Sequence, residues 1–288
     1  MESYLSLIDR ILTDGKEKSD RTGVGNLAIF GVELKHDMSR GFPLLTTKKM
    51  YTKAIFVELE GFIKGITDKK WYQDRNCHIW NEWCNPQIVP YGHDLETKSK
   101  MKEERDLGPI YGFQWRHFGA EYNGYDKDYN GEGIDQLSKI VKTLKTNPTD
   151  RRMIVSAWNP LDLDKMALPP CHYSFEVSVI NNKLNLKWNQ RSVDAILGFP
   201  FNIASYATVL HLLVNESGFE AGELIAHLGD THIYKNQIEN AKLQLTRKPY
   251  PLPEIEIINF SSIFNWQHSQ IRINNYQCHP KIEFPLAV

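Results

Sequence analysis

A cysteine stands where the chain can use it as a nucleophile. Cys171 follows two consecutive prolines and precedes His172. Because proline fixes φ, the backbone there holds the next side chain in one direction. A thiol attacks as its thiolate, which nearby cations stabilise. Arg191 ends the second strand of a hairpin predicted to follow Cys171, so we expect its guanidinium beside the thiol. The Pro-Pro-Cys-His run alone fits equally well a buried structural cysteine with an incidental histidine.

Arginines in loops are the candidates for binding an anion. Arg21 lies in a glycine-containing turn, and Arg151 and Arg152 follow Asn-Pro-Thr-Asp. A guanidinium binds phosphate through two hydrogen bonds, whereas an arginine pair before a strand more often forms surface ion pairs. The formal net charge of −1 argues against the broadly basic surface of a general nucleic-acid binder. We therefore expect these arginines to bind a small anionic substrate.

Several polar or aromatic residues stand inside apolar, structured sequence. Asn202 begins an apolar helical segment, where it can cap the helix or present its amide to the edge of a heterocycle. His232 and Tyr234 alternate on a strand-like run, so both side chains face one side and can hold one hydroxyl group. Trp80 and Trp83 are either ordinary core or flat plates for stacking a cofactor.

Composition and targeting signals indicate the compartment. The 288 residues are 41% hydrophobic, a normal globular balance. The N-terminus lacks the basic and apolar segments of a signal peptide, and no apolar run has the length of a membrane helix. The four cysteines contain no CxxC pair, so neither a disulfide framework nor a zinc site is indicated. We expect a cytoplasmic protein with no membrane contact and no metal.

Hydrophobic periodicity predicts the elements that must position these residues. Helices are expected at 2–15, 51–65, 134–146 and 203–214, the last of them buried all round. Strands are expected at 27–30 and 32–34, as a hairpin or bulged pair, and at 152–157, 173–180, 183–189, 224–228 and 254–259. Asn181-Asn182 suits a hairpin turn, segment 92–106 reads as a solvated insertion or short helix, and 119–133 reads as a loop. With no repeat and no linker, this order predicts one α+β domain over 1–288.

Longer motifs occur together in one order. They are Asp20-Arg-Thr-Gly-Val-Gly25, Gly41-Phe-Pro-Leu-Leu-Thr-Thr-Lys-Lys49, Leu107-Gly-Pro-Ile-Tyr-Gly112, Asp150-Arg-Arg-Met-Ile-Val-Ser-Ala-Trp-Asn159, Met166-Ala-Leu-Pro-Pro-Cys-His172, Gln190-Arg-Ser192, Phe199-Pro-Phe-Asn-Ile-Ala-Ser-Tyr206 and Gly229-Asp-Thr-His-Ile-Tyr234. On these motifs the chain resembles the thymidylate synthase family over essentially its whole length. The resemblance implies a twisted mixed β-sheet packed against helices, with a sheet face forming a homodimer interface. It also implies dUMP as substrate and 5,10-methylenetetrahydrofolate as co-substrate, the donor of a carbon and a hydride.

The resemblance assigns catalytic roles by position. Cys171 adds to C6 of the uracil ring and makes C5 nucleophilic. Asn202 matches the residue that hydrogen-bonds uracil N3–H and O4 and stabilises the developing enolate. Glu58 matches the glutamate that organises proton transfer through water, and Tyr111 the tyrosine that assists removal of the C5 proton. Trp80 matches the residue that shields the exocyclic methylene from water.

Two further sets of residues match the binding sites of the family. The dUMP-binding set is Arg21, Gln190, Arg191, Ser192, Asp194, Asn202, His232 and Tyr234, with Arg151 and Arg152 reaching across from the second subunit. The folate-binding set is Ile79, Trp80, Asp194, Leu197, Gly198, Phe201, Ala287 and Val288. By the same resemblance, Asp194 binds the pterin and the carboxylate of Val288 helps to close the site.

The chain departs from the family pattern beside the matched glutamate. Where Glu-Leu-Leu-Trp-Phe is usual, this chain has Glu58-Leu-Glu-Gly-Phe62. Glu60 lies two positions from Glu58, so we expect it on another face of the helix. Further departures are noted at Phe113, Asn189 and Leu228.

These departures leave two alternatives. In a dUMP 5-hydroxymethylase of the same superfamily, water attacks the same methylene adduct and the folate is not oxidised. Trp80, the C-terminal Pro-Leu-Ala-Val and Asn202 favour the methylating enzyme, since an aspartate in place of Asn202 would favour cytosine. The other alternative is a non-enzymatic nucleotide- or RNA-binding module, against which the nucleophile, the glutamate and the tryptophan together argue.

Overall fold

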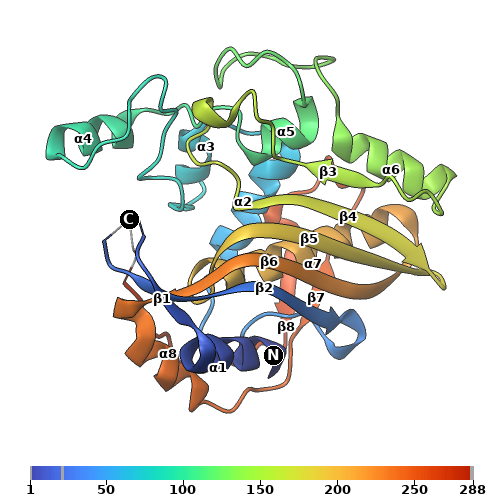
Figure 1. Cartoon of the computed structure of the whole chain (residues 1–288). Coiled ribbons are helices and arrows are strands. Elements are labelled where there is room, and N and C mark those ends of the chain that lie inside the picture. Colours follow the sequence, from blue (N-terminus) through green and yellow to red (C-terminus); the bar gives the residue numbers. More distant parts are fainter. Residues whose placement is uncertain (1, 21–22, 286–288) are drawn as a thin grey trace. The chain divides into compact units, whose positions relative to one another are not determined.

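Helical and alternating patterns of apolar residues produce an α+β structure, shown in Figure 1 as a computed structural model that describes residues 2–20 and 23–285. The helices are α1 (Glu2–Asp14), α2 (Thr52–Lys64), α3 (Lys69–Gln73), α4 (Leu95–Glu103), α5 (Tyr111–His117), α6 (Gln136–Thr146), α7 (Gly198–Ser217) and α8 (Ile238–Leu245). The strands are β1 (Lys16–Lys18), β2 (Asn26–Asp37), β3 (Ile154–Ser156), β4 (His172–Ile180), β5 (Lys183–Asp194), β6 (Glu220–Tyr234), β7 (Glu254–Ile257) and β8 (Ile271–Asn274).

The strands form a mixed sheet. Strands β1 to β6 follow the order β1-β2-β6-β5-β4-β3, and β7 pairs separately with β8. β5 and β6 run parallel, whereas β1 with β2, β2 with β6, and β3 with β4 are antiparallel. Figure 1 shows the strands twisting along the sheet, as the chirality of L-residues requires. The expected α+β class with a twisted mixed sheet is confirmed.

The chain divides into two compact units. Among the described residues, the first unit takes those up to Tyr51, those from Val177 to Asn259 and those from Ile271 onward, and the second takes Thr52–Glu176 and Phe260–Gln270. Strand β4 therefore begins in the second unit and ends in the first. The assignment of one domain to residues 1–288 stays a prediction.

In the first unit, helices cover the strands that carry the predicted binding residues. α7 packs on β5 and β6, and α1 packs on β2 and β6. Leu184, Leu186 and Trp188 alternate along β5 and are fully buried, and Trp188 stacks on Tyr206 of α7 with ring centroids 5.0 Å apart. Burial of each such side chain contributes roughly 1.5–3 kcal/mol. This layer fixes the end of β5 against the start of α7.

In the second unit, α2 and α5 pack closely together. Every residue of α2 from Ala54 to Ile63 is buried. A Cβ added to Gly112 of α5 would lie 2.6 Å from the carbonyl oxygen of Phe62, so only glycine permits this approach of the two helices. α6 packs in turn on α5 and β3. Tyr111, the first residue of α5, is thereby held against α2.

Most of the predicted elements are present. The helices expected at 2–15, 51–65 and 134–146 are α1, α2 and α6, and the buried helix expected at 203–214 is α7, which begins earlier at Gly198. Asn181 and Asn182 have φ of 51° and 62°, both positive as a type I′ hairpin turn requires.

Two parts of the element prediction are wrong. The separate strands predicted at 27–30 and 32–34 are one strand, β2, which passes through Gly31 at φ 76°. The sequence patterns do not predict the short helices α3, α5 and α8 or the short strands β1 and β8, because their few residues carry little periodicity. Segment 92–106 contains α4, and 119–133 has no helix or strand among its residues, which the structure describes in full.

Candidate active site

In the second unit, Cys171 lies directly before β4 and beside α5. Its backbone N–H donates to the hydroxyl oxygen of Tyr111 over 2.8 Å. The Tyr111 ring stacks on His172 with centroids 4.3 Å apart and on Phe62 at 4.7 Å. Cys171 is partly exposed and is not in a disulfide. The structure thus brings together two predicted residues that are 60 positions apart.

Glu58 is a buried carboxyl on α2 beside Trp80. Burial raises the pKa of Glu58 to about 7, and the nearby indole N–H of Trp80 lowers it by less. That N–H is not aligned as a hydrogen bond, since within the described part of the chain the buried Nε1 of Trp80 has no partner of good geometry. The indole ring stands edge-on to Phe62 and Tyr111, with centroids 6.3 Å and 6.1 Å away. Near neutral pH both protonation states of Glu58 are populated, as a group that passes protons requires.

Glu60 lies on another face of α2 than Glu58, as expected, and its carboxylate has different partners. Its carboxylate accepts hydrogen bonds from the backbone N–H of His268 at 2.8 Å and from Nδ1 of the same residue at 2.6 Å, and it pairs with Lys64 at 2.5 Å. Burial raises the pKa of Glu60, but these hydrogen bonds and the ion pair outweigh it and hold the pKa below its ordinary value. The carboxylate therefore ties segment 260–270 to α2.

Packing against Tyr72 explains why position 61 is a glycine. A Cβ on Gly61 would lie 2.3–2.5 Å from atoms of the Tyr72 ring. Tyr72 is fully buried and its hydroxyl donates to the carbonyl oxygen of Ile66 over 3.0 Å. The Tyr72 ring thus fills space that a larger residue at position 61 would need.

In the first unit, hydrogen bonds fix the amide of Asn202. Gln190 is buried at the end of β5, and its Nε2 donates to Oδ1 of Asn202 and to the carbonyl oxygen of Ser192, both over 3.1 Å. Its Oε1 accepts from Nε1 of Trp188 over 3.2 Å. The N-cap of α7 is Leu197, with no side-chain capping bond, so the alternative that Asn202 caps this helix is wrong. The amide is instead oriented by Gln190.

Asp194 shapes the turn that leads into α7. Its Oδ1 accepts from the backbone N–H groups of Ile196 at 3.0 Å and Leu197 at 2.9 Å. Lys48 donates from Nζ to the carbonyl oxygen of Ile196 over 2.6 Å. Burial lowers the pKa of Lys48 to about 8, and the charge of Asp194 opposes this shift. The predicted folate-side residues of this unit, Leu197, Gly198 and Phe201, lie at the start of α7.

His232 and Tyr234 are neighbours on β6, as predicted. Their rings are 5.1 Å apart and nearly perpendicular. Nδ1 of His232 lies 2.9 Å from Oδ1 of Asp230, and Lys18 also pairs with this carboxylate. Burial raises the pKa of Asp230, but the bonds from Lys18 and His232 hold it below its ordinary value. An ionised carboxylate only accepts, so Nδ1 carries a proton, and in the neutral imidazole Nε2 is then the acceptor.

The arginines predicted to bind phosphate lie on the surface, as far as the structure describes them. Arg152 is 87% exposed and makes two 2.9 Å hydrogen bonds to Asp150 of its own chain. Arg151 and Arg191 are exposed as well. Cys171 and Arg191 belong to different units, and their expected proximity stays a prediction, as does the reach of Arg151 and Arg152 into a second subunit. Of the predicted site residues, Arg21, Ala287 and Val288 lie outside the described residues.

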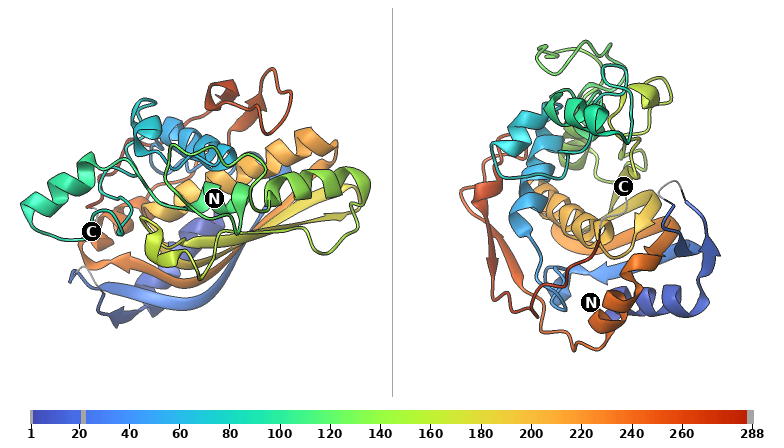
Figure 2. Two further views of the ribbon diagram at one scale, coloured as in Figure 1. Left: turned by 90° about the horizontal axis from the view of Figure 1, so that it is seen from above. Right: turned by 90° about the vertical axis from the view of Figure 1, so that its left-hand side faces the viewer.

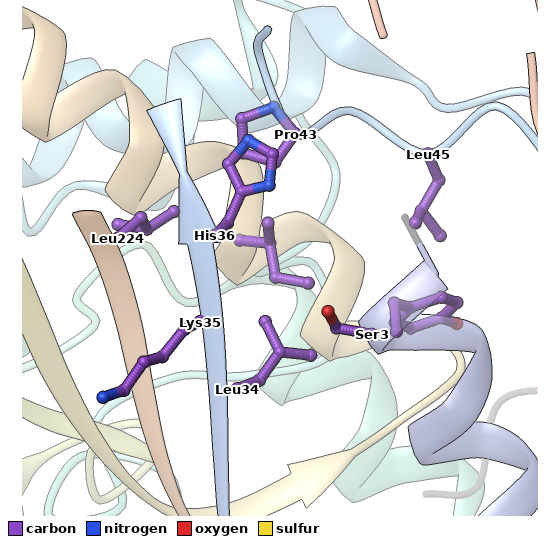
Figure 3. A pocket seen from close by; sticks show the side chains of 9 residues that line it. Ser3, Leu34, Lys35, His36, Pro43, Leu45 and Leu224 are labelled. Atoms are coloured by element: carbon purple, nitrogen blue, oxygen red, sulfur yellow. The ribbon is translucent and has the colours of Figure 1, made fainter. Parts of the chain in front are cut away.

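A separate pocket of the first unit lies beside the start of α1 (Figure 3). It is lined by Ser3, Tyr4, Leu34, Lys35, His36, Pro43, Leu45, Ile203 and Leu224. The ring of His36 bonds through Nε2 to the carbonyl oxygen of Gly41 over 2.8 Å. No described residue of the predicted site lines this pocket, so it is not where we place the chemistry.

Sequence reasoning missed residues near Cys171 and near Asp194. The sequence pattern gives His172 no role, yet it is buried against Tyr111, and burial lowers its pKa to about 3, which keeps the ring neutral. Its position next to Cys171 was the available signal. Lys48 lies in the motif Gly41–Lys49 and Phe62 in Glu58–Phe62, but only a buried cation and a ring contact single them out.

The remaining expectations concern metal binding and membrane insertion. In residues 2–20 and 23–285 no three His, Cys, Asp or Glu side chains gather as metal ligands would. Across the same residues, no helix has the length and apolar character needed to span a bilayer. The expectation that no metal is used stays a prediction.

The residues around Cys171 and those around Asn202 have the features of an enzyme that combines a thiol nucleophile with proton transfer and recognition of a small planar ligand. The family model described as thymidylate synthase matches residues 2–288. The chain is 44% identical over 286 residues to a thymidylate synthase of Homo sapiens, covering 99% of this chain and 90% of that protein. It is equally 44% identical over 286 residues to a bifunctional dihydrofolate reductase-thymidylate synthase of Paramecium tetraurelia, of which it spans 61%. This chain belongs to the thymidylate synthase family.

Proposed function

We propose that this chain catalyses the reductive methylation of dUMP to dTMP with 5,10-methylenetetrahydrofolate. The observation that carries the proposal is the group around Cys171, where a partly exposed thiol, the Tyr111 hydroxyl and a carboxyl of pKa about 7 occur in one unit of a family member. A protein that only binds nucleotides has no need of a desolvated carboxyl and a partly exposed free cysteine together. The human relative and the family model favour the methylating reaction over hydroxymethylation.

Cys171 acts as the nucleophile. Its sulfur forms a bond to C6 of the uracil ring, and the electron pair of the C5–C6 double bond passes to C5 as an enolate. When bound, 5,10-methylenetetrahydrofolate supplies the one-carbon unit and a hydride and is released as dihydrofolate. The bond between sulfur and C6 breaks after C5 has lost its proton, which restores the thiolate.

Glu58 and Tyr111 handle the protons. With a pKa near 7, Glu58 holds and releases a proton at physiological pH through a bound water. The Tyr111 hydroxyl accepts the N–H of Cys171, so its own proton remains available for donation while an oxygen lone pair can face the C5 proton. Phe62 and Trp80 exclude bulk water from this carboxyl and thereby maintain its raised pKa.

Recognition of dUMP falls to the first unit. Asn202, oriented by Gln190, reads N3–H and O4 of uracil and stabilises the enolate. Nε2 of His232, an acceptor because Nδ1 is bonded to Asp230, and the hydroxyl of Tyr234 hold the 3′-hydroxyl of the deoxyribose. The phosphate is bound by Arg21, Arg191 and Ser192.

The folate side has a donor that suits the co-substrate. The Trp80 Nε1 is buried without an acceptor among the described residues, and Asp194 and Lys48 place two polar side chains on the backbone at the start of α7. We assign Ile79, Trp80, Asp194, Leu197, Gly198, Phe201, Ala287 and Val288 to folate binding. A thiolate nucleophile needs a reducing compartment, so we also propose a cytoplasmic location.

We propose that the protein acts as a homodimer in which Arg151 and Arg152 bind the phosphate in the site of the second subunit. Both are exposed, and the arginine fork suits a phosphate. Mixing Cys171→Ala protein with Arg152→Ala protein tests this assignment, since a mixed dimer contains one intact site. Activity regained on mixing supports shared sites, and two variants that stay inactive together contradict them.

A product assay tests the reaction itself. Incubation with dUMP and 5,10-methylenetetrahydrofolate should yield dTMP and dihydrofolate in equal amounts. Chromatography measures the dTMP, and absorbance measures the dihydrofolate. Formation of 5-hydroxymethyl-dUMP without dihydrofolate would replace the proposal with the hydroxymethylase. Nucleotide binding without turnover would instead revive the non-enzymatic binding module.

A further inference from the structure

Lys69, at the start of α3, is a buried cation with an unusual set of partners. Lys69 is only 1% exposed to solvent. Nζ donates to three backbone carbonyl oxygens, those of Met101 at 2.6 Å, Trp83 at 2.9 Å and Asn81 at 3.4 Å. An ammonium has three donors, so these carbonyls use all of them. Lys69 therefore joins two chain segments at one point.

One of those segments is the insertion helix α4. The carbonyl of Met101 belongs to the last turn of α4 (Leu95–Glu103), where carbonyl groups lack partners within the helix. A cation at this end also suits the helix dipole. Lys69 thus caps α4, and the backbone N–H of the same residue donates to the carbonyl of Arg105 just beyond that helix.

The other segment is the turn that carries Trp80. Residues 78–83, here called the Trp80 turn, are closed by the bonds Asn81 N–H to His78 and Trp83 N–H to Trp80. The carbonyls bound by Lys69 follow Trp80 by one and three residues. Gln73, at the other end of α3, donates from Nε2 to Oδ1 of Asn81 over 3.0 Å. Both ends of α3 are therefore hydrogen-bonded to the Trp80 turn.

The charge makes the Lys69 contacts obligatory. Burial lowers its pKa, and the negative charges of Glu104 and Glu82 oppose that shift only in part. A buried ammonium is strongly disfavoured unless every donor is used. If the Trp80 turn moved away, two of the three hydrogen bonds would be lost while the charge stayed buried. The turn is thereby held in one position.

We propose that Lys69 is a positioning residue that sets where the Trp80 indole lies. It links α4, through the Trp80 turn, to the aromatic contacts that Trp80 makes with Phe62 and Tyr111. The inference deepens the proposed function and rests on it, because the exclusion of water by Trp80 decides whether the transferred carbon leaves as a methyl or a hydroxymethyl group. Lys69 touches no reacting atom in this scheme.

The test compares Lys69→Met with Lys70→Met. Methionine keeps the apolar stem of Lys69 and removes the cation, whereas Lys70 is 53% exposed and pairs only with Asp74 among its described contacts. In the ligand-free protein, Lys69→Met should speed hydrogen exchange of the Trp80 turn. In turnover it should lower kcat roughly 10- to 100-fold, leave dUMP affinity within about twofold of wild type, and release 5-hydroxymethyl-dUMP beside dTMP. Lys70→Met should match the wild type in every measurement.

Other outcomes decide against the proposal. If Lys69→Met weakens dUMP binding and heat stability together while dTMP stays the sole product, the residue is merely structural. If that variant does not fold, Gln73→Ala loosens the same turn while the three carbonyl groups keep their bonds to Lys69, and unchanged exchange and products in it would overturn the inference. A wild type that makes no dTMP would refute the proposed function instead. Exchange in the Trp80 turn would still report whether Lys69 holds it.

Discussion

The two groups of residues described above are built on opposite principles. The nucleophile group, consisting of Cys171, Tyr111, His172, Phe62, Glu58 and Trp80, has aromatic walls, and burial moves the pKa values of Glu58 and His172. The amide group, consisting of Trp188, Gln190, Ser192 and Asn202, contains no shifted titratable group, and its buried amide uses both ends in hydrogen bonds.

This difference separates reactivity from recognition. Removing water changes the protonation equilibria of carboxyl and imidazole groups, which creates an acid or base suited to pH 7. Fixing donors and acceptors by hydrogen bonds shifts no protonation equilibrium, but it selects a ligand whose edge matches. Changes in the nucleophile group should therefore alter rates, and changes in the amide group should alter substrate choice and stability.

The largest effect is expected from Cys171→Ala. Without the sulfur no bond to C6 forms, so kcat should fall by at least about 10⁴-fold, as in other enzymes that lose their nucleophile. The dUMP affinity of the variant, measured by calorimetry, should stay near that of the wild type, because the amide group is intact. Retained turnover would refute the covalent mechanism.

Glu58→Gln should lower kcat by roughly 10²- to 10⁴-fold, the usual contribution of a general acid or base. It should also change the pH dependence of stability. The folded pKa of about 7 lies above the ordinary 4.5, so stability from the neutral buried acid is complete below pH 4.5 and is lost as pH rises to 7. The loss amounts to about 3 kcal/mol.

The check is urea unfolding at several pH values. The free energy of unfolding of the wild type, relative to Glu58→Gln, should fall from pH 4.5 to 7 and then level off. Taking the difference removes the contribution of His172, whose lowered pKa acts in the opposite direction, destabilising the fold as pH falls below 6.5. A flat difference would mean that Glu58 is ionised across this range.

Asn202→Asp should alter specificity more than rate. The aspartate still accepts the hydrogen bond from Gln190, so the amide group keeps its geometry, while a protonated carboxyl or bound water can match the edge of cytosine. The ratio of kcat/KM for dUMP to that for dCMP should fall roughly 100-fold. An unchanged ratio in competition assays would show that Asn202 does not read the pyrimidine.

The smallest effect is expected from Gln190→Ala. It leaves the indole N–H of Trp188 buried without an acceptor, and this should lower the free energy of unfolding by about 1–3 kcal/mol. The matched control is Gln87→Ala, because Gln87 donates to a carbonyl on the surface of the second unit, and its loss should change stability by less than about 0.5 kcal/mol. Equal losses in the two variants would contradict the proposed difference between the groups.

Local patterns predicted the parts of the fold that depend on local information. The turn at Asn181-Asn182 and the buried helix α7 follow from residue types within a few positions. The bond from Cys171 to Tyr111 depends instead on α5, a seven-residue helix without a side-chain N-cap, for which the local signal is weak. Lys69 gave no signal, since a lysine at a helix start is normally exposed.

The close contact between Gly61 and Tyr72 constrains how this sequence can have changed over its history. Tryptophan is usual at the position of Gly61 in the family, yet here the Tyr72 ring already occupies that space. Enlarging residue 61 first would create a clash, and shrinking residue 72 first would open a cavity that destabilises the fold by about 3–5 kcal/mol. Neither order has a favourable intermediate. The two positions should therefore covary among relatives, with a small residue at position 72 wherever position 61 is large.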